Sequence, residues 1–523
     1  MLVPLTPLEF ARRTRTLYPD RQAVVDGDLR LTYAQFFDRC DRWSSALQAL
    51  GVEPGDRVAY IAPNVHAQLE SFYAVPQIGA TLVPINYRLT AADFEYIINH
   101  SGATVVCASA DYLDAVDGIR AAIAGVRHLV ALDGARDRWL DYEALVAKAS
   151  PAFTPAAIDE NDVITINYTS GTTARPKGVM MTHRNTHLNV VGTLLHLPMR
   201  MTDRYLWTLP MFHANGWTYV WIVTAVGGTH VCLPKVDPAR VFALVRDEGI
   251  TCLCAAPTVL IGLANAPAEV RANVPSGVHV VTAGAPPAAA TIERIEGDLG
   301  WTITQVYGMT ETAPFITVCE PRPHHDAMSL ADRALIKARQ GVELITSGEI
   351  RVVDEQMRDV PADGETLGEI VVRGNVVMKG YYNDPDATAQ AFRGGYMHTG
   401  DAAVMHPDRY VEVRDRIKDV IISGGENISS VEVEAMLLRH PTVQEAAVVG
   451  MPDAKWGEAP HAFLVLKAGA SATAEEIRRF TRDRLAHFKC PHTVTFVPEL
   501  PKTATGKIQK FVLRGGRAAI STQ

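Results

Sequence analysis

Short apolar runs alternate with helix-like segments over residues 51–317. This alternation is typical of α/β architecture, in which each strand of a parallel sheet is followed by a helix that packs back on it. Three of the runs, residues 163–168, 277–282 and 302–307, lead directly into stretches of Gly, Ser, Thr and Pro, and a helix is expected over residues 288–299. Because ligands bind at the carboxyl ends of the strands in open α/β sheets, a ligand site is predicted where these loops meet.

The pattern changes after about residue 341. Residues 349–353, 368–373 and 410–414 read as short alternating strands that are separated by Gly, Pro and Asp. Alternation of apolar and polar side chains favours antiparallel pairing with one solvated face. A small antiparallel β subdomain is therefore expected to follow the parallel-sheet region.

The last part of the chain has a mixed α+β pattern. Residues 446–450 and 461–466 are predicted strands, and residues 474–488 are predicted to form an amphipathic helix with Ile477, Phe480, Leu485 and Phe488 on one face. About 110 residues remain after Asp415, which is enough for a small domain of its own. We therefore predict an N-terminal domain over residues 1–415 and a mobile C-terminal domain over residues 416–523.

Length and charge limit the classes of protein that remain. At 523 residues the chain is too long for one core, and its net charge of −8 gives no reason to expect a nucleic acid or an anionic membrane as partner. The most apolar stretch, residues 217–233, is short and interrupted by glycines, so it is expected to be buried rather than membrane-spanning. Residues 1–20 lack the order of a signal peptide, and the scattered cysteines fit no metal or redox spacing. A cytoplasmic protein is predicted.

The first segment that carries chemistry is Thr-Ser-Gly-Thr-Thr-Ala-Arg-Pro-Lys-Gly at residues 169–178. Hydroxyls, flexible backbone amides and a lysine are the groups that wrap a polyphosphate. The segment is not a Walker A sequence, because Pro176 and Gly178 stand where that motif needs Gly and Ser or Thr. Taken alone, it is equally well explained as a solvated turn.

Two further segments place an acid after a short polar stretch. In Gln-Val-Tyr-Gly-Met-Thr-Glu, residues 305–311, a Thr hydroxyl stands beside a carboxylate, which suits a phosphate and its magnesium ion. In Tyr-Met-His-Thr-Gly-Asp, residues 396–401, Asp401 follows a turn and can accept hydrogen bonds from ribose hydroxyls. Each acid by itself is also explained as a helix cap, a surface acid or a turn former.

The remaining two segments lie towards the C-terminus. A charged stretch at residues 415–419 is followed by Ser-Gly-Gly-Glu-Asn at residues 423–427, which indicates a boundary that can swivel. Pro-Lys-Thr-Ala-Thr-Gly-Lys-Ile at residues 501–508 is a turn that presents Lys507. A lysine near a terminus is more often a solvated charge than a catalytic group.

In this order along one chain, the five segments resemble the core motifs of the adenylate-forming superfamily, which contains acyl- and aryl-CoA synthetases, nonribosomal-peptide adenylation domains and luciferases. The resemblance covers nearly the whole chain and includes Ala-Gly-Ala-Pro at residues 283–286, the loop that lines the adenine and acyl sites in that family. It implies an acyl-CoA synthetase that uses ATP and Mg²⁺ to convert a carboxylic acid to its adenylate, and then coenzyme A to form the thioester.

The resemblance also implies roles for individual residues. The ATP-binding residues would be Thr169, Ser170, Gly171, Thr172, Thr173, Lys177, Gly284, Ala285, Pro286, Gln305, Val306, Tyr307, Gly308, Met309, Thr310, Asp401, Arg416 and Lys507. Glu311 and Thr169 would hold the metal. The sequence departs from the family at Ala174, where Gly is usual, so a stiffer phosphate loop is expected.

The catalytic group implied by the resemblance comprises Lys507, Thr310, Glu311 and His213. Lys507 would bridge the substrate carboxylate and the α-phosphate, two anions that repel unless a cation lies between them. For the second half-reaction the small domain would rotate about Lys418 and bring forward a CoA-binding loop that contains Gly424, Gly425 and Glu426.

The acyl pocket is predicted from Pro-Met-Phe-His-Ala-Asn-Gly-Trp at residues 210–217, which is similar to the corresponding segment of fatty acyl-CoA synthetases. Its walls would be formed by His213, Trp217, Gly284, Ala313 and Pro314. Apolar walls favour a medium-chain, branched or thioether acid, and aryl acids remain an alternative. His213 and Trp217 are also explained as ordinary core residues.

Three rival functions and the oligomeric state remain open at this point. An acyl- or aryl-AMP ligase would pass the acyl group to a carrier protein, a luciferase-like oxygenase would share the first half-reaction, and a silent scaffold would bind nucleotide without chemistry. The substrate partner is expected to be a small carboxylic acid, and the chain is either a monomer or a homodimer. His324, His325 and Asp326 are assigned to a surface loop, because three adjacent residues do not easily converge on one ion.

Overall fold

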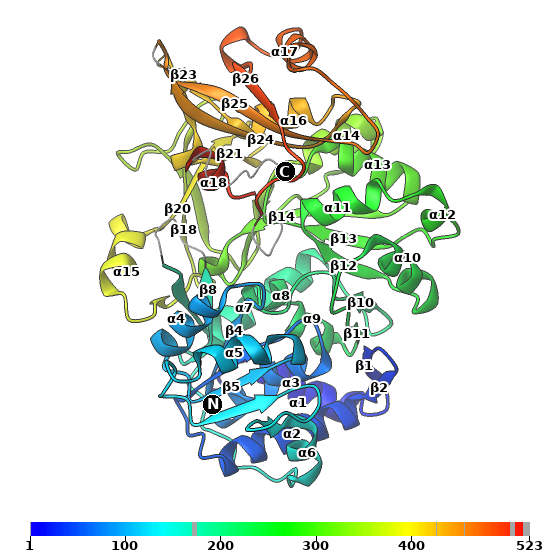
Figure 1. Cartoon of the computed structure of the whole chain (residues 1–523), viewed down its shortest axis with the longest axis vertical. Helices are drawn as coiled ribbons and strands as arrows, with labels where there is room; N and C mark the ends of the chain where they lie inside the picture. The colour runs from blue at the N-terminus through cyan, green and yellow to red at the C-terminus, as the bar shows by residue number, and fades with distance from the viewer. Residues whose placement is uncertain (1, 170–174, 425, 454, 503–507, 516–523) are drawn as a thin grey trace.

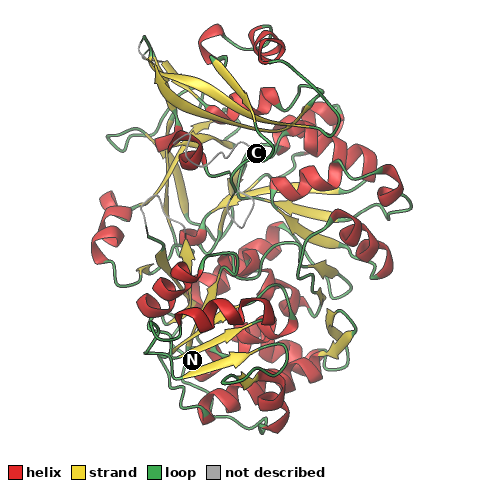
Figure 2. Ribbon diagram, in the orientation of Figure 1, coloured by secondary structure: helices red, strands yellow, loops and turns green. Residues whose placement is uncertain are grey.

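The structure is a computed structural model that describes residues 2–169, 175–424, 426–453, 455–502 and 508–515. Two mixed sheets with helices on their faces form the larger part of the molecule, and a smaller sheet caps it at the C-terminal end (Figure 1). Helices flank the strands of both large sheets, as Figure 2 shows. The predicted α/β class, with a small antiparallel subdomain and an α+β C-terminal part, is confirmed.

The eight-stranded sheet has the order β19-β9-β8-β4-β3-β5-β6-β7. Strands β3 to β8 pair in parallel, whereas β9 and β19 are antiparallel at one edge. The parallel strands are largely apolar because helices cover both faces of the sheet. The bounds are β3 Arg57–Ile61, β4 Thr81–Ile85, β5 Val105–Ala108, β6 His128–Ala131, β7 Leu140–Asp141, β8 Val163–Thr169, β9 Lys177–Thr182 and β19 Gly380–Tyr381.

The nine-stranded sheet has the order β16-β15-β14-β13-β12-β10-β11-β1-β2. Its centre is parallel from β14 to β1, and its two edges are antiparallel. The bounds are β1 Gln22–Asp26, β2 Leu29–Thr32, β10 Arg204–Leu206, β11 Thr229–Val231, β12 Cys252–Ala255, β13 His279–Thr282, β14 Thr302–Gly308, β15 Phe315–Val318 and β16 Val342–Glu343.

Helices pack on both large sheets, and several begin at a threonine whose side chain caps the first turn. Thr32, Thr90 and Thr182 each form a capping box with the side chain three residues later. The helices are α1 Leu8–Leu17, α2 Tyr33–Ala49, α3 His66–Ala74, α4 Ala91–Ser101, α5 Leu113–Ile119, α6 Tyr142–Lys148, α7 His183–His196, α8 Ala214–Trp217, α9 Tyr219–Val226, α10 Pro238–Asp247, α11 Pro257–Ala264, α12 Ala268–Arg271, α13 Ala289–Leu299 and α14 Leu330–Lys337.

The antiparallel subdomain is a four-stranded sheet of order β17-β18-β20-β21. The strands are β17 Glu349–Val353, β18 Gly368–Arg373, β20 Met397–Met405 and β21 Val411–Arg416, and α15 spans Pro385–Ala391. Its β18 and β20 lie on the left of Figure 1, between the two large sheets and the C-terminal cap. Strand β21 ends at Arg416 and runs into a short 3₁₀ helix over Ile417–Asp419, where the domain boundary is predicted.

The C-terminal cap is a five-stranded sheet with helices α16 Ser430–Leu437, α17 Ala474–Arg482 and α18 Lys510–Gly515. Its strands are β22 Ile421–Ser423, β23 Glu426–Ile428, β24 Val443–Asp453, β25 Gly457–Leu466 and β26 Thr493–Phe496. Strands β24 and β25 pair over nearly their full length and form the long ribbon at the top of Figure 1.

Two local predictions were wrong. The helix expected over residues 474–488 ends at Arg482, because the charged residues Arg482, Asp483 and Arg484 are all exposed and leave no apolar face to bury. Phe488 is accordingly 40% exposed. The expected surface loop at His324–Asp326 is part of a 3₁₀ helix over Pro323–Ala327, which buries His325.

The predictions for the apolar stretch and for the cysteines are confirmed. The apolar residues 217–233 lie in α8, α9 and β11 and are mostly buried. None of the described helices is long and apolar enough to cross a membrane. All seven cysteines are buried and unpaired, consistent with their assignment as core residues.

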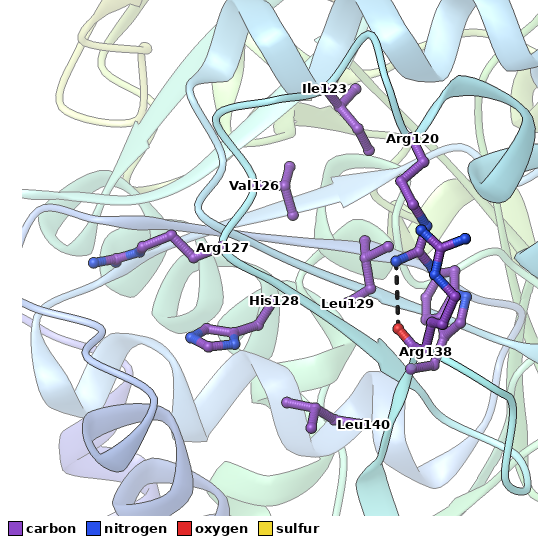
Figure 3. A pocket seen from close by; sticks show the side chains of 9 residues that line it. Arg120, Ile123, Val126, Arg127, His128, Leu129, Arg138 and Leu140 are labelled. Carbon is purple, nitrogen blue, oxygen red and sulfur yellow. Dashed lines mark hydrogen bonds between the residues drawn. The ribbon is translucent and has the colours of Figure 1, made fainter.

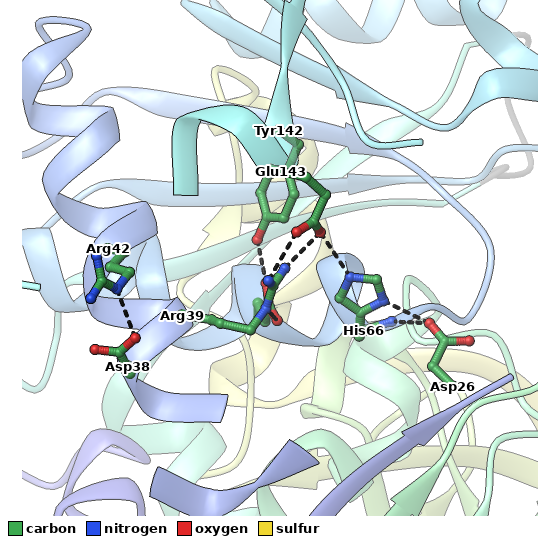
Figure 4. A network of polar contacts seen from close by, with 8 residues as sticks. Asp26, Asp38, Arg39, Arg42, His66, Tyr142 and Glu143 are labelled. Carbon is green, nitrogen blue, oxygen red and sulfur yellow. Dashed lines mark hydrogen bonds and ion pairs between the residues drawn. The ribbon is translucent and has the colours of Figure 1, made fainter. Parts of the chain in front are cut away.

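A network of charged side chains ties four elements of the N-terminal region together (Figure 4). His66 on α3 contacts Asp26 of β1 through Nδ1 (2.8 Å) and Glu143 of α6 through Nε2 (3.1 Å). Arg39 on α2 pairs with Glu143 (2.7 Å) and with the fully buried Glu70 (2.6 Å). Burial lowers the pKa of His66, but pairing with Asp26 and Glu143 outweighs burial and raises that pKa to about 10. Burial raises the pKa of Glu143, but His66 and Arg39 outweigh burial and lower that pKa to about 2.

These shifts make the network's contribution to stability depend on pH. The contribution of His66 is full below its ordinary pKa of about 6.5 and is lost as the pH rises through 10, whereas that of Glu143 is full above about 4.5 and is lost as the pH falls through 2. We expect His66→Ala to lower the free energy of unfolding by about 2 kcal/mol at pH 6, and by clearly less at pH 10. Urea unfolding at both pH values measures this. Arg12→Ala, which removes an exposed ion pair with Glu9, is the control; an equal loss for His66→Ala at both pH values would contradict the prediction.

Candidate functional site

Loops from three sheets meet at the predicted ligand site, and two hydrogen bonds join them. The Tyr381 hydroxyl on β19 donates to Glu311 Oε1, 2.9 Å away, and Glu311 lies just after β14. The Tyr307 hydroxyl on β14 donates to Asp401 Oδ2 on β20, 2.7 Å away. The first bond links the eight-stranded to the nine-stranded sheet, and the second links the nine-stranded sheet to the antiparallel subdomain. Two acids predicted from separate motifs therefore lie in one region.

Glu311 is a buried carboxylate whose surroundings suit a cation. Its backbone carbonyl accepts a hydrogen bond from Met378 N (2.8 Å), which fixes the short 3₁₀ helix Thr310–Thr312 against the segment that leads to β19. Burial raises the pKa of Glu311, and the Tyr381 hydroxyl partly offsets that rise. The ammonium of Lys177 lies 4.9 Å from the centre of the Tyr381 ring. Lys177, Tyr381 and Glu311 thus lie in a line at the start of β9, which follows the predicted phosphate loop.

The donor set fits magnesium as an ion held jointly with a substrate. Among the described residues there is no group of three or more His, Cys, Asp or Glu side chains that could hold a metal. Magnesium is commonly bound by one or two carboxylates, with phosphate oxygens and waters completing the shell. Glu311, a single hard oxygen donor in line with Tyr381 and Lys177, matches that arrangement. The predicted second ligand, Thr169, is the last residue of β8 and lies opposite Lys177 in the ladder.

Tyr381 was not among the residues predicted from the sequence, and it gives a direct test of this arrangement. Because its hydrogen bond lowers the pKa of Glu311, Tyr381→Phe is expected to raise that pKa. We expect about a tenfold lower kcat/KM for MgATP and an acid limb of the pH–rate profile that moves to higher pH. Tyr382→Phe, next in the chain, is the matched control. An unchanged acid limb in Tyr381→Phe would show that the hydroxyl does not act on Glu311.

Asp401 forms the second half of the site. Its Oδ1 pairs with Arg416 Nε at 2.8 Å, and Arg416 also donates to the Thr399 carbonyl at 3.0 Å. Burial lowers the pKa of Arg416, but Asp401, Tyr307, Glu311 and Asp419 together more than offset this, so the net shift is upward and the side chain stays cationic. Tyr307 and Arg416 therefore hold the Asp401 carboxylate in place, with lone pairs left to accept hydrogen bonds from a diol.

The loops after β13 and β14 complete the predicted nucleotide wall. Gln305 and Val306 are buried, and the Val306 side chain belongs to the same apolar cluster as Trp217 and Ala313. A Cβ on Gly308 would lie 1.8 Å from the Pro314 carbonyl oxygen, so only glycine fits there. After β13, Gly284 is exposed with φ of 90°, and Ala285 and Pro286 are half-buried.

The predicted acyl wall is assembled as one apolar cluster. The Trp217 ring packs edge-on against Phe315, with centroids 5.8 Å apart, and both side chains are buried together with Ala313. His213 is half-buried at the start of the same turn, and its backbone N–H donates to the Pro210 carbonyl at 3.1 Å.

Several predicted residues are not part of this arrangement or are not described. Ser170, Gly171, Thr172, Thr173, Gly425 and Lys507 lie outside the described residues. Lys418 is exposed in the 3₁₀ helix after β21, and Gly424 and Glu426 lie in the β22–β23 hairpin. Gly424 N donates to the Trp456 carbonyl at 2.8 Å, so this hairpin packs within the C-terminal cap.

A pocket of about 400 Å³ lies away from all of these residues, at the β6–β7 edge of the eight-stranded sheet (Figure 3). Arginines and one histidine surround an apolar floor, with Arg120 close to Trp139. Arg120 and Arg127 are already paired with Asp117 and Asp56. We therefore do not assign the pocket to the reaction.

Comparison with known proteins agrees with the geometry. The pattern that defines the family described as AMP-binding enzyme matches residues 11–382, and that of the AMP-binding enzyme C-terminal domain matches residues 432–507. The chain is 44% identical over 520 residues to 4-hydroxybutyrate–CoA ligase 2 of Metallosphaera sedula, covering 98% of this chain and 94% of that protein. It is 41% identical over 537 residues to the peroxisomal acetate/butyrate–CoA ligase AAE7 of Arabidopsis thaliana, again covering 98% and 94%.

Among solved structures, the anthranilate CoA ligase AuaEII in complex with anthranoyl-AMP superposes with a TM-score of 0.90. Its sequence is 26% identical, and the match covers 98% of each chain. The full-length matches, together with the acids and tyrosines that join the three sheets, confirm the family that the sequence motifs predicted. The chain belongs to the AMP-binding, adenylate-forming enzymes, in their acyl-CoA synthetase branch.

Proposed function

We propose that this enzyme adenylates a short-chain carboxylic acid of about four carbons and transfers the acyl group to coenzyme A. The structural observation behind the chain length is the buried Trp217, which packs edge-on against Phe315 at the predicted acyl wall. We take these two rings to limit the length of the alkyl chain. The two relatives described above, named for 4-hydroxybutyrate and for acetate and butyrate, support the same range. This proposal replaces the medium-chain or branched acid expected from the sequence with a shorter one.

In the proposed first half-reaction a carboxylate oxygen attacks the α-phosphorus of ATP, and the bond to pyrophosphate breaks. When bound, magnesium neutralises phosphate charge and eases the departure of pyrophosphate. Glu311 and Thr169 would hold it, with Thr310 at the α-phosphate and Asp401 on the ribose hydroxyls. Lys177 and the phosphate loop would bind the β- and γ-phosphates.

In the proposed second half-reaction the thiolate of coenzyme A attacks the acyl carbon, and the bond from that carbon to the AMP oxygen breaks. Of the two carboxylate oxygens, one stays in the thioester and the other leaves with AMP. The small domain, residues 416–523, would turn about Lys418 between the two steps. A closed site favours adenylation because it excludes water, whereas thioester formation needs an entry path for the thiol.

A panel of acids from acetate to laurate, with benzoate and cinnamate, tests the substrate class through acid-dependent pyrophosphate release. We expect the highest kcat/KM between three and five carbons, and at least a tenfold fall by octanoate, because a rigid wall rejects added methylenes. A maximum at octanoate or longer, or with benzoate, would overturn the short-chain assignment. Butyryl adenylate that accumulates and is not converted to thioester when coenzyme A is added would favour the rival carrier-protein ligase.

A further inference from the structure

Five consecutive residues after His213 have a left-handed backbone. The φ angles are 39° at Ala214, 48° at Asn215, 55° at Gly216, 52° at Trp217 and 66° at Thr218. Glycine and asparagine adopt this conformation readily, but other L-residues adopt it only when their surroundings enforce it. Such a turn, which we call the 214–218 turn, needs specific contacts to hold its shape.

The contact that holds its centre comes from the strand that leads into the phosphate loop. The Asn215 amide Nδ2 donates to Thr165 Oγ1 on β8 at 2.9 Å, and Asn167 Nδ2 donates to the same oxygen at 2.8 Å. Thr165 and Asn215 are fully buried, and Asn167 is almost so. Strand β8 continues from these residues to Thr169, the first residue of the phosphate loop. One side-chain hydrogen bond thus joins the acyl wall to the ATP-binding strand.

Packing fixes the rest of the turn on either side of Asn215. A Cβ on Gly216 would lie 2.4 Å from the Trp207 ring, so the backbone there rests directly on that ring. On the other side Trp217 packs against Phe315. The turn has no room to shift against these rings without a change in the direction of His213 and Trp217.

The buried amides are not arranged for greatest stability. Neither Asn215 Oδ1 nor Asn167 Oδ1 has a hydrogen-bond partner among the described residues. Buried polar groups that serve stability alone are normally satisfied on both sides. Strained backbone and under-satisfied polar groups are found together where position has been favoured over stability. We therefore interpret the Asn215–Thr165 contact as one that fixes the position of the 214–218 turn on β8.

We propose that Asn215 is a positioning residue: through Thr165 it sets the 214–218 turn, and with it His213 and Trp217, at a fixed place relative to the phosphate loop. The carboxylate of the acid is then aligned with the α-phosphate that it attacks. This inference rests on the proposed function, because it assumes that His213 and Trp217 contact the acid. The 214–218 turn controls the acid site, whereas the ATP site on β8 is built without it.

Thr165→Val tests the contact, because valine keeps the shape of threonine and removes the acceptor oxygen. We expect KM for butyrate to rise about tenfold, KM for ATP to stay within twofold, and the preference for butyrate over hexanoate to fall at least threefold. Thr165→Ser, which restores the hydroxyl, should return all three values to within twofold of wild type. Thr14→Val is the matched control, since Thr14 is equally buried and hydrogen-bonded but lies on α1.

Asn215→Gly and Asn215→Ala form a second pair in case Thr165→Val folds poorly. Both remove the amide, but glycine keeps the left-handed backbone available, so both should raise KM for butyrate and only alanine should also lower the melting temperature. If Thr165→Val and Asn215→Gly are folded and active with wild-type KM for butyrate and wild-type acid preference, the inference fails and the proposed function stands. Equal rises in both KM values would also overturn it. A wild-type enzyme without acid-dependent AMP formation would overturn both.

Discussion

Replacement of Lys507 by alanine is expected to slow formation of the acyl adenylate by about 10²–10³-fold while leaving conversion of supplied acyl adenylate to thioester close to wild type. The reason is electrostatic. A carboxylate that approaches a phosphate needs a cation between the two anions, whereas a thiolate that attacks the acyl carbon of the finished adenylate does not need that cation.

Lys507 itself lies outside the described residues, but the residues that flank positions 503–507 contact the small domain. Lys502 Nζ pairs with Glu445 on β24 at 2.7 Å, and Lys510 Nζ pairs with Glu434 on α16 at 2.9 Å. Lys502 and Ile508 also form an isolated antiparallel bridge. The described residues on either side of positions 503–507 are therefore held to the small domain.

The two half-reactions are measured separately, by acid-dependent pyrophosphate–ATP exchange and by thioester formation from synthetic butyryl adenylate. Lys148→Ala, on the exposed face of α6, is the control. Lys418→Pro should give roughly the reverse pattern, because proline fixes φ at the predicted hinge and hinders the rotation that the second step needs. Equal damage to both half-reactions in Lys507→Ala would refute its assigned role, and thioester formation that survives in Lys418→Pro would show the hinge to be elsewhere.

Glu311→Gln should reduce adenylation by about 10²–10³-fold, because it replaces the charged ligand of magnesium with a neutral amide of the same shape. Loss of folding does not explain such a result. Burial raises the pKa of Glu311 in the folded protein, so its ionisation opposes folding once the pH exceeds the ordinary value for Glu. The amide is therefore expected to leave stability at pH 7 unchanged or higher.

Initial rates across a magnesium titration, together with a melting curve, test Glu311→Gln. The control is Glu343→Gln, an exposed acid on β16. The expected outcome is a large fall in rate with a melting temperature equal to or above that of wild type. A variant that melts normally and keeps its rate within threefold of wild type would remove Glu311 from the metal site.

Much of the fold was predictable because it depends on local patterns. Residues 349–353 and 368–373 are short runs rich in Ile and Val, and they form β17 and β18 over those same residues. The extent of β24 and β25 was underestimated, since their long antiparallel pairing extends well beyond the apolar runs. The helix after Thr473 was overestimated, because four apolar residues at helical spacing do not show which of them will find a partner.

In the candidate site too, residues in local motifs were predictable and residues placed by tertiary packing were not. Glu311 and Asp401 each stand in a short motif, so their chemistry could be inferred before their positions were known. Tyr381 lies seventy residues from Glu311 in the chain and reaches it because β19 pairs with β9 at the edge of the eight-stranded sheet. The sequence around it, Gly-Tyr-Tyr at residues 380–382, does not distinguish a functional tyrosine from one in an ordinary turn. The Asn215–Thr165 contact likewise depends on tertiary packing.

The most direct test of the proposed chemistry is the fate of a labelled oxygen. Butyrate with ¹⁸O in its carboxyl group is incubated with the enzyme, ATP, Mg²⁺ and coenzyme A, and the products are analysed by mass spectrometry. Attack by the carboxylate on the α-phosphorus predicts one ¹⁸O in AMP for each butyryl-CoA formed. Label in inorganic phosphate instead, with ADP as the nucleotide product, would contradict the adenylate route.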